Sequence, residues 1–512
     1  MRNFLAFSAL LLPWLNPFSP GPTAAVIPFL FSWLCAAVCG YALIHASQSN
    51  SREQLTSVIA QAWLVAASIS SAIGLLQYFG ITTWAGHWVN HTSFGEAYGN
   101  LRQRNQFATL LNIGLAATLY FAHSQQRDTD IYPTSQVRTS MSVLLPVAIL
   151  LGIANMASSS RTGLIQMILL VIVTWIWTHK STPTNAHTPQ HKIFMVLLAA
   201  LSAYAVAAFA LPWLAGLDPS SSGALARLRA GDALCSSRLT LWNNVLYLIS
   251  HKPWTGWGWG ELDYAHFITL YPGARFCDIL DNAHNLPLHL AVELGIPVAV
   301  LACGITIWLV WCARPWHESN PTRQLAWSVL AVIGLHSLLE YPLWYGPFQI
   351  ASILSIWIVW RSPKEPTAAH KPTNVTQPII YTSAFIATLV IASCVFAAWN
   401  YQLASQIYMA PASRMAMYRE DTLEKINKVI LFQDQVKFAR LTTTELDASN
   451  AQEIHDLALD MLHFSPEARV VELILESSRL LGQTNEINFF SQRYQAAFPD
   501  AYANWLASQS KK

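Results

Sequence analysis

Charged side chains are scarce in this sequence. Only 11% of its 512 residues are Asp, Glu, Lys or Arg, whereas 53% are hydrophobic and the mean hydropathy is +0.32. Soluble domains carry about 25% charged residues, so the composition excludes an ordinary soluble protein. The 30 basic and 28 acidic residues leave a formal charge of +2, and without a basic field we predict no nucleic-acid partner. The 21 Trp and 17 Tyr suit a bilayer interface, so membrane lipids are the expected surroundings.

The few charges are unevenly distributed, because residues 401–512 hold 25 of the 58 charged side chains. We therefore predict a membrane-embedded domain over residues 1–400 and a soluble helical domain over residues 401–512. In the second domain, apolar spacing predicts one helix through Val470 that stops at Gly482, and another through Tyr494. Its ending loosely resembles a tetratricopeptide (TPR) unit. The domain is either a packed helical cap or an acceptor-docking surface.

Eleven apolar runs are long enough to span a bilayer, which predicts an all-α, polytopic membrane protein. These runs are residues 4–18, 23–45, 55–79, 104–123, 141–157, 162–178, 193–213, 296–313, 325–340, 347–361 and 379–400. The first run has no clear signal-peptide cleavage site and further spans follow it at once.

The Lys and Arg residues of the short loops predict a cytoplasmic N-terminus. The tail and a long loop at about residues 214–295 then lie outside. The residues assigned to the inside are Arg2, Arg52, Arg127, Arg138, Lys180, Lys192, Arg314, Arg323, Arg361, Lys364 and Lys371.

Cysteines are few, and five of the seven fall in or beside the predicted spans. Cys235 and Cys277 lie in the long outside loop, where an oxidising compartment would let them pair. We predict a disulfide between them. Two unrelated free thiols are the alternative.

Polar residues form four clusters on the predicted outer side, where unpartnered burial would be costly. They are residues 100–106, residues 158–163, the long loop with Arg238 and residues 257–260 and 281–285, and residues 340–345. Arg104, Arg161 and Arg238 in these clusters could bind a lipid diphosphate, because the planar guanidinium matches phosphate oxygens bidentately. Alternatively, each Arg contacts lipid headgroups nonspecifically.

His284 is the candidate general base. An imidazole with a pKa near 6.5 can accept the proton of an attacking hydroxyl, and Asp281 is placed to orient the ring. A lone His is more often structural, and we assign a structural role to the others, among them His266, His289 and His336. His284 differs from these because Asn282 and Asn285 flank it and an apolar helix follows.

Acidic residues are missing where a metal-dependent membrane glycosyltransferase would need them. The first outside loop, residues 16–22, has no carboxylate, and Glu96 and Glu340 are isolated in the sequence. We therefore predict no metal and no cofactor, and expect Arg residues to stabilise the leaving group.

These motifs resemble the bacterial O-antigen ligase superfamily, and most closely its PglL-type pilin glycosylation ligases, which are general protein O-oligosaccharyltransferases. The similarity covers nearly the whole chain. Its more specific stretches are residues 99–107 and 159–163. Residues 251–254 with 256–258 are less specific, residues 238–242 match more weakly, and residues 281–286, 293–296 and 340–343 complete the pattern.

The resemblance implies an inner-membrane enzyme that transfers a glycan from undecaprenyl diphosphate to a hydroxyl on the periplasmic face, with pilin among the acceptor proteins. It implies that His284 is essential and that Arg161 and Arg238 hold the diphosphate. A Gln that maps to Gln103 or Gln106 and the Tyr that maps to Tyr341 also matter. Asn285 and Glu340 complete the positioning residues that we predict.

Three alternatives stay open. A lipid A-core ligase and an O-antigen polymerase share this spanning core, and they differ in the acceptor. A multispan transporter is the alternative from another class, but it would need polar residues along a path through the spans. Here the spans are almost free of charge, which favours chemistry at one face.

Overall fold

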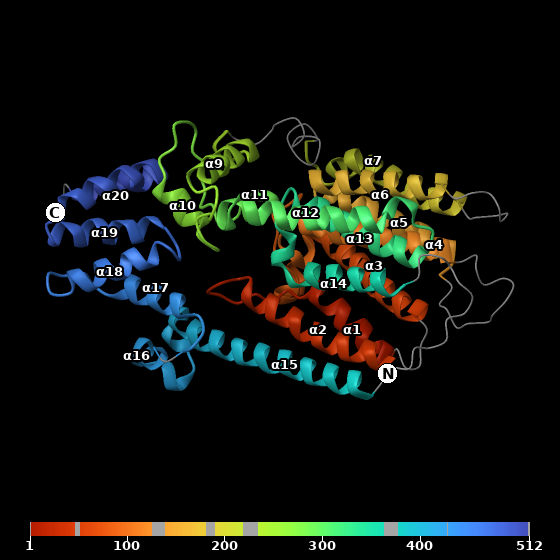
Figure 1. The fold of residues 1–512 in the computed structure, drawn as a ribbon, viewed down its shortest axis with the longest axis horizontal. Coiled ribbons are helices and arrows are strands. Elements are labelled where there is room, and N and C mark those ends of the chain that lie inside the picture. The colour runs from red at the N-terminus through yellow and green to blue at the C-terminus, as the bar shows by residue number, and fades with distance from the viewer. Residues whose placement is uncertain are drawn as a thin grey trace. The chain divides into compact units, whose positions relative to one another are not determined.

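The computed structural model describes residues 2–46, 52–124, 139–180, 190–218, 234–362, 377–427 and 429–509. Within these ranges the chain is all-helical and has no strand (Figure 1), which confirms the predicted fold class at this level. Four residues used to predict the orientation lie outside the described ranges: Arg127, Arg138, Lys364 and Lys371.

Each of the eleven apolar runs coincides with a helix. These helices are α1 (Arg2–Leu15), α2 (Val26–Ala46), α3 (Arg52–Tyr78), α4 (Arg104–Ser124), α5 (Met141–Ala157), α6 (Arg161–Lys180), α7 (Gln190–Leu214), α12 (Ile296–Ala313), α13 (Pro321–Ser337), α14 (Gly346–Arg361) and α15 (Gln377–Ser405). In the described part of the chain, six helices are long and apolar enough to cross a membrane: α2, α3, α6, α7, α12 and α15. The number of eleven spans and the orientation stay predictions.

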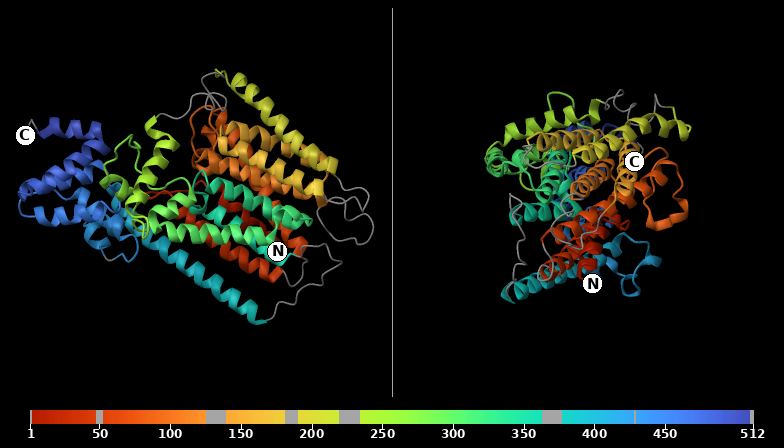
Figure 2. Two further views of the ribbon diagram at one scale, coloured as in Figure 1. Left: turned by 45° about the horizontal axis from the view of Figure 1, so that its top comes forward. Right: turned by 90° about the vertical axis from the view of Figure 1, so that its right-hand side faces the viewer.

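The chain forms two compact units. Unit 1 comprises Met1–Ala230 and Leu309–Val395, and unit 2 comprises Gly231–Trp308 and Phe396–Lys512. In unit 1, α4 packs against α3, α5, α6 and α13, and every residue from Gln106 to Ala122 is buried. The helices of this unit run side by side (Figures 1 and 2).

Small residues allow this close packing in unit 1. A Cβ on Gly114 of α4 would lie 2.3 Å from the Cβ of Ala67 in α3. A Cβ on Gly152 of α5 would lie 2.3 Å from the carbonyl oxygen of Ala200 in α7. Small residues at helix interfaces are typical of membrane bundles, because they let the backbones approach.

Unit 2 is built from shorter helices: α9 (Arg238–His251), α10 (Leu262–Ile268), α11 (Leu286–Leu294), α16 (Thr422–Ile426), α17 (Gln433–Thr443), α18 (Ala451–Met461), α19 (Ala468–Leu480), α20 (Thr484–Ala497) and α21 (Pro499–Gln509). The predicted helix pair of the tail is confirmed as α19 and α20. Gly482 lies between them at φ +73°, a left-handed conformation that suits glycine.

Eight short 3₁₀ turns connect helices in the described ranges. They are η1 (Thr83–Trp88), η2 (Gly99–Leu101), η3 (Leu234–Ser236), η4 (Pro315–His317), η5 (Pro342–Trp344), η6 (Gln406–Tyr408), η7 (Pro411–Ser413) and η8 (Ala416–Tyr418).

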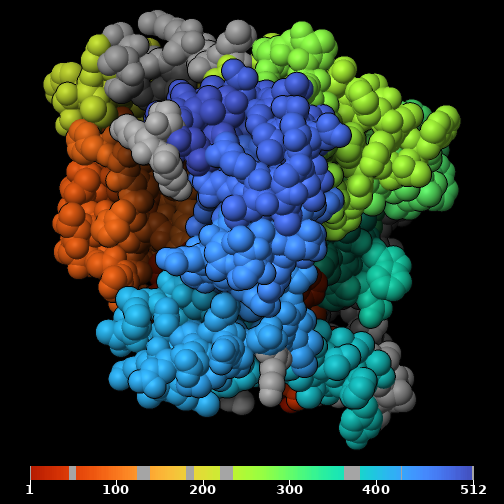
Figure 3. Space-filling view, turned by 90° about the vertical axis from the view of Figure 1, so that its left-hand side faces the viewer, coloured from red at the N-terminus to blue at the C-terminus, as the bar shows by residue number. Residues whose placement is uncertain are grey.

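In unit 2 the segment predicted as a long loop and the segment predicted as a tail share one hydrophobic core. Phe267 of α10 is buried with residues of α17 to α21, and Figure 3 shows the blue tail helices beside the yellow-green α9 to α11 region. The ring of Tyr264 stacks on His463 at 3.8 Å, and Arg493 Nε donates to the Ile268 carbonyl at 2.7 Å. The predicted domain boundary at residue 400 stays a prediction from the sequence composition.

Candidate functional site

The candidate site residues divide between the two units. Unit 1 contains Gln103, Arg104, Gln106, Arg161, Glu340 and Tyr341, and unit 2 contains Cys235, Arg238, Cys277, His284 and Asn285.

Two buried amides fix the turn that leads into α4. Gln77 is 1% exposed; its Nε2 donates to the Gly99 carbonyl at 2.9 Å, and its Oε1 accepts from the Gly99 N–H at 2.7 Å. Asn100 Nδ2 donates to the Leu15 carbonyl of α1 at 2.8 Å. Gly99 has φ +58°, and a Cβ there would lie 3.1 Å from Phe107. Gly99 and Asn100, the first two residues of the 99–107 motif, therefore act by fixing the backbone of this turn.

Arg104, the first residue of α4, already has an anionic partner. Its Nη2 lies 3.2 Å from Glu96 Oε1 and donates to the Tyr98 hydroxyl at 2.9 Å. The Tyr98 hydroxyl in turn donates to the Glu96 carboxylate. Burial and the hydrogen bond to Glu96 raise the pKa of Tyr98 to about 12. Glu96, isolated in the sequence, is thus paired in space, and part of the Arg104 charge is compensated.

The two candidate glutamines differ in their surroundings. Gln106 is 2% exposed, whereas Gln103 is half-buried. The carbonyl oxygen of the Gln103 side chain is buried and accepts no hydrogen bond from the described residues. An unsatisfied buried acceptor is costly, so the Gln103 side chain has an oxygen that can still accept a hydrogen bond from a bound group.

Asn105, which the sequence analysis did not single out, connects three of the motifs. Its Nδ2 donates to Glu340 Oε1 at 3.1 Å, and its Oδ1 accepts from the Ser160 hydroxyl at 2.6 Å. Ser160 also caps α6, because its Oγ accepts from the Gly163 N–H at 3.0 Å. No local sequence signal could have found Asn105, since its partners lie 55 and 235 residues away.

Arg161 is the first residue of α6 and is exposed. Glu340 is 3% exposed and precedes η5. The neighbouring Tyr341 stacks on Tyr345 with ring centroids 6.0 Å apart. Arg161 directly follows Ser160 in the chain, and Tyr341 directly follows Glu340. Asn105 therefore joins the two residues that precede these candidates.

In unit 2, Arg238 occupies the same kind of position as Arg161. It is the first residue of α9, is half-buried, and follows Ser237, whose Oγ accepts from the Thr240 N–H at 3.2 Å. Both Arg residues thus begin a helix directly after a serine cap. The partial positive charge of a helix N-terminus favours anions.

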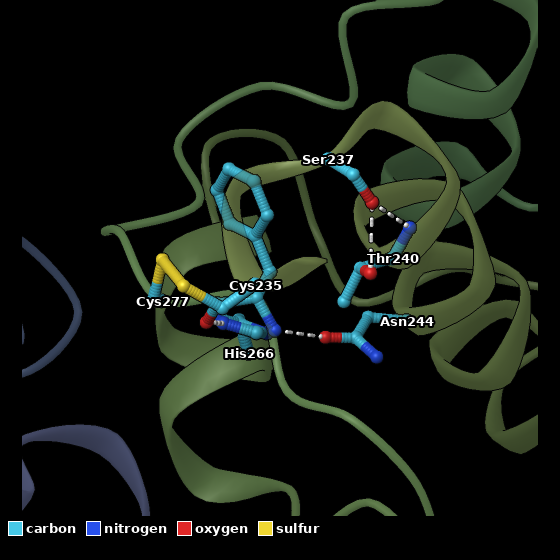
Figure 4. Close-up of a disulfide and its surroundings, with 7 residues drawn as sticks. Cys235, Ser237, Thr240, Asn244, His266 and Cys277 are labelled. Atoms are coloured by element: carbon cyan, nitrogen blue, oxygen red, sulfur yellow. Dashed lines mark hydrogen bonds between the residues drawn. A yellow bond between two sulfur atoms is a disulfide. The ribbon is translucent and has the colours of Figure 1, made fainter. Parts of the chain in front are cut away.

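A disulfide anchors the segment before Arg238 (Figure 4). Cys235 and Cys277 are bonded, with a Cα–Cα distance of 5.3 Å. Beside it, Asn244 Oδ1 accepts from the Phe276 N–H at 2.8 Å. His266 Nε2 lies 3.1 Å from the Phe276 carbonyl, which can only accept, so Nε2 carries the proton. Burial lowers the pKa of His266 to about 3, which fits the structural role expected for it.

His284 is held in an unusual backbone conformation. It has φ +49°, a left-handed geometry that non-glycine residues rarely adopt. Its N–H donates to Asn282 Oδ1 at 2.9 Å, and Trp242 Nε1 of α9 donates to the preceding Ala283 carbonyl at 3.1 Å. Asp281, expected to orient the ring, is exposed. These contacts fix the peptide bond that precedes the candidate base.

Asn285 begins α11 as its N-cap, since its Oδ1 accepts from the Leu288 N–H at 3.0 Å. One and two turns further along, His289 Nε2 and Glu293 Oε2 lie 3.4 Å apart and are almost fully buried. Burial and the nearby His284 lower the pKa of His289 to about 4, and burial raises that of Glu293 to about 7. The pair is therefore predominantly uncharged at slightly acidic pH. The sequence analysis did not identify Glu293 as a partner of His289.

The glycines of the remaining motifs bring two segments of unit 2 together. A Cβ on Gly256 would lie 2.3 Å from the Glu293 backbone, and one on Gly295 would lie 2.3 Å from the Trp254 carbonyl oxygen. The Gly258 N–H also donates to the Glu293 carbonyl at 3.0 Å. Residues 251–258 and 293–296 therefore support α11 and, through it, the His284 segment.

Comparison with known proteins finds that segments of this chain are similar to three described families. The family described as "Protein glycosylation ligase" matches residues 97–122, "O-Antigen ligase" matches residues 146–303, and "Virulence factor membrane-bound polymerase, C-terminal" matches residues 324–512. The first two matches contain the motifs around Gln103, Arg161, Arg238 and His284. No solved structure matches.

Two curated relatives come from Acinetobacter baylyi (strain ATCC 33305 / BD413 / ADP1). A "General O-oligosaccharyltransferase" is 25% identical over 363 residues, which cover 69% of this chain and 58% of the relative. A "ComP-specific O-oligosaccharyltransferase" is 23% identical over 328 residues, which cover 63% and 54%. The chain thus spans little more than half the length of these relatives. The matches confirm the predicted resemblance to the O-antigen ligase superfamily and its protein glycosylation ligases.

Proposed function

From the similarity of this chain to O-antigen ligases and protein glycosylation ligases, we propose that it is a glycosyltransferase that performs protein O-glycosylation. It transfers an oligosaccharide from undecaprenyl diphosphate to Ser or Thr hydroxyls of periplasmic proteins, pilin among them. The names of both relatives, which are O-oligosaccharyltransferases, support an oligosaccharide donor and a protein acceptor.

The proposed location is the bacterial inner membrane, with eleven spans and the reacting residues on the periplasmic face. The coincidence of eleven apolar runs with eleven helices supports the spans. The disulfide between Cys235 and Cys277 supports an oxidising compartment for the long loop. The helical tail, residues 401–512, would form a TPR-like domain on the same side.

The observation that carries the assignment of His284 is its fixed left-handed backbone. Strained positions persist only where the surrounding structure holds them, and they cluster at functional sites. Here Asn282 and the Trp242 indole hold the segment. A ring presented from such a segment can take a proton without first losing conformational freedom.

In the proposed reaction, the acceptor hydroxyl attacks the anomeric carbon as His284 takes its proton. The bond from that carbon to the diphosphate oxygen breaks with inversion, and the electron pair leaves on the lipid diphosphate. Arg161 and Arg238 stabilise the negative charge that grows there. Arg104 contributes less, because Glu96 compensates its charge. Gln103, Gln106, Tyr341, Asn285 and Glu340 position donor, acceptor or the segments that hold them.

A reconstituted transfer assay tests this proposal. Proteoliposomes receive the polyprenyl-diphosphate-linked oligosaccharide and an acceptor protein, and glycosylated acceptor is measured by mass. We expect transfer in excess chelator, because no cofactor or metal is part of the proposed chemistry. His284→Ala should abolish transfer while leaving the protein in the membrane. A fully active His284→Ala variant would overturn its role as base, and a strict need for a divalent cation would overturn the Arg-based mechanism.

A second candidate function is favoured by two of the family matches. "O-Antigen ligase" matches residues 146–303 and "Virulence factor membrane-bound polymerase, C-terminal" matches residues 324–512. An O-antigen ligase would transfer the glycan to lipid A-core, and a polymerase would transfer it to another lipid-linked glycan. Offering lipid A-core, lipid-linked glycan and protein acceptors in parallel separates the three activities.

A further inference from the structure

Asn105 is the point at which three segments of unit 1 meet. Its two amide atoms are used in opposite directions, since Nδ2 donates to Glu340 and Oδ1 accepts from Ser160. Both partners are nearly inaccessible, with Ser160 1% exposed and Glu340 3% exposed. Each partner is the chain neighbour of a candidate site residue, Arg161 in one case and Tyr341 in the other.

A buried polar network continues from this bridge along α4. Thr109, one turn further along α4, has its hydroxyl 2.9 Å from His336 Nδ1 of α13, and Gln166 Nε2 of α6 donates to that hydroxyl at 2.8 Å. Asn112 Nδ2 donates to the Gly163 carbonyl at 3.0 Å. Helices α4, α6 and α13 are therefore connected at several positions along α4. Among these positions, Asn105 lies nearest to the N-terminus of α4.

The packing beside the bridge leaves little room for rearrangement. A Cβ on Gly163 would lie 2.6 Å from the Cβ of Ala108 in α4. Because α4 and α6 are already this close, the orientation of the α6 N-terminus depends on small shifts at Ser160. Interiors packed to this density transmit strain instead of absorbing it.

The two partners need a side chain that donates to one and accepts from the other, as the Asn105 amide does. A carboxylate accepts but cannot donate, so it would repel Glu340, and an apolar side chain would leave both partners unsatisfied. Removing one partner of a buried hydrogen bond to a charged group costs about 1.5–3 kcal/mol, which is about 10-fold to 100-fold in an equilibrium constant.

We propose that Asn105 is a positioning residue of the transfer reaction, and that its side-chain amide holds the α6 N-terminus with Arg161 in register with the Glu340–Tyr341 segment. The proposal rests on the proposed function. It assigns Glu340 an indirect role, because the Glu340 carboxylate would act as the acceptor that anchors the bridge and not as a group that touches the donor.

Reversing the polarity of the bridge tests this. Asn105→Asp places two carboxylates face to face. Glu340→Gln keeps an oxygen that can accept from Asn105 Nδ2. In the double variant, the new amide at position 340 can donate to the new carboxylate at position 105, which still accepts from Ser160. The half-buried Asn16, whose Oδ1 accepts from the Phe18 N–H, offers the control Asn16→Asp.

We expect kcat for transfer to fall at least about tenfold in Asn105→Asp. Asn16→Asp should stay within about threefold of the original chain, and Glu340→Gln should lower kcat less than Asn105→Asp does. The double variant should recover most of the loss seen in Asn105→Asp. The KM for the lipid-linked donor should rise in Asn105→Asp and return in the double variant. An effect on folding alone would lower the amount of active protein without changing this KM.

Three outcomes would overturn the proposal: full activity in Asn105→Asp, no recovery in the double variant, or inactivation by Glu340→Gln alone, which would make the Glu340 charge part of the chemistry. Failure of the proposed function is distinguishable, because the original chain would then transfer no glycan. In that case the melting temperature of each purified variant tests the bridge itself. Asn105→Asp should lower the melting temperature and the double variant should restore it, and equal values for all variants would refute the bridge.

Discussion

Removal of the Cys235–Cys277 disulfide should destabilise unit 2 by a predictable amount. The bond joins residues 42 positions apart. Closing a loop of this length reduces the chain entropy of the unfolded state, which corresponds to about 4 kcal/mol at 25 °C in the loop-entropy model. Such a loss is a large share of the net stability of a small domain, about 5–15 kcal/mol. The disulfide also lies three residues before Arg238 and seven before His284, so transfer activity should fall with stability.

Thermal unfolding and limited trypsin digestion of the full chain in nanodiscs measure this effect. Cys235→Ser, Cys277→Ser and the double variant should show the same lowered transition, because each breaks the same bond. Trypsin should then cleave earlier at Lys252 and Arg275, which lie in unit 2. Cys394→Ser, which removes a free thiol of α15, is the control. The reasoning is refuted if the variants unfold and digest like the original chain, or if the double variant loses twice as much as either single one.

The remaining predictions concern pH, packing and charge. His266 binds a proton below about pH 6.5 when unfolded but only below about pH 3 when folded. Burial of His266 therefore lowers the free energy of unfolding by about 2 kcal/mol at pH 5 relative to pH 7.5. Glu293 and Asp263, whose pKa values burial raises to about 7, act in the opposite sense. The test is thus the difference between the original chain and His266→Gln in denaturant titrations at both pH values; equal pH dependence would contradict it. Gly163→Ala places a Cβ 2.4 Å from Asn155 Oδ1 and should destabilise unit 1 by about 1–3 kcal/mol, measured as a lower melting temperature. Gly304→Ala, with nothing within 4 Å of its Cβ, should leave the melting temperature unchanged. An unchanged melting temperature for Gly163→Ala would show that α4 and α6 can separate freely. Arg104→Gln should reduce transfer less than Arg161→Gln in the reconstituted assay, because Glu96 compensates part of the Arg104 charge and the family resemblance assigns the diphosphate to Arg161. The reverse order would place Arg104 at the donor.

Features encoded in short stretches of sequence were predictable. Apolar runs gave the positions of the eleven helices, because the length and composition of a run suffice to identify a helix in this kind of chain. The helix pair around Gly482 followed from local periodicity and a helix-stopping glycine. The pairing of Cys235 with Cys277 followed from elimination, since no other Cys lies in the predicted long loop.

Contacts between distant segments were not predictable. Glu96 is isolated in the sequence and becomes an ion-pair partner of Arg104 only because the Gln77 amide folds the intervening turn. Asn105 has an ordinary place in a polar motif, and its role depends on helices that begin and end far along the chain. The shared core of α10 and the tail likewise depends on Phe267, one apolar residue among many. A single sequence records each residue but not which distant residue it meets.

The most direct test of the central claim is the glycosylation state of extracytoplasmic proteins in cells with and without this chain. Intact-mass spectrometry of these proteins, pilin first, would be combined with analysis of lipopolysaccharide. The account predicts that glycan is lost from the proteins and returns with the original chain but not with His284→Ala. Intact glycoproteins together with lipopolysaccharide that has lost its O-antigen would contradict it, and would assign the chain to the lipid A-core ligases or O-antigen polymerases.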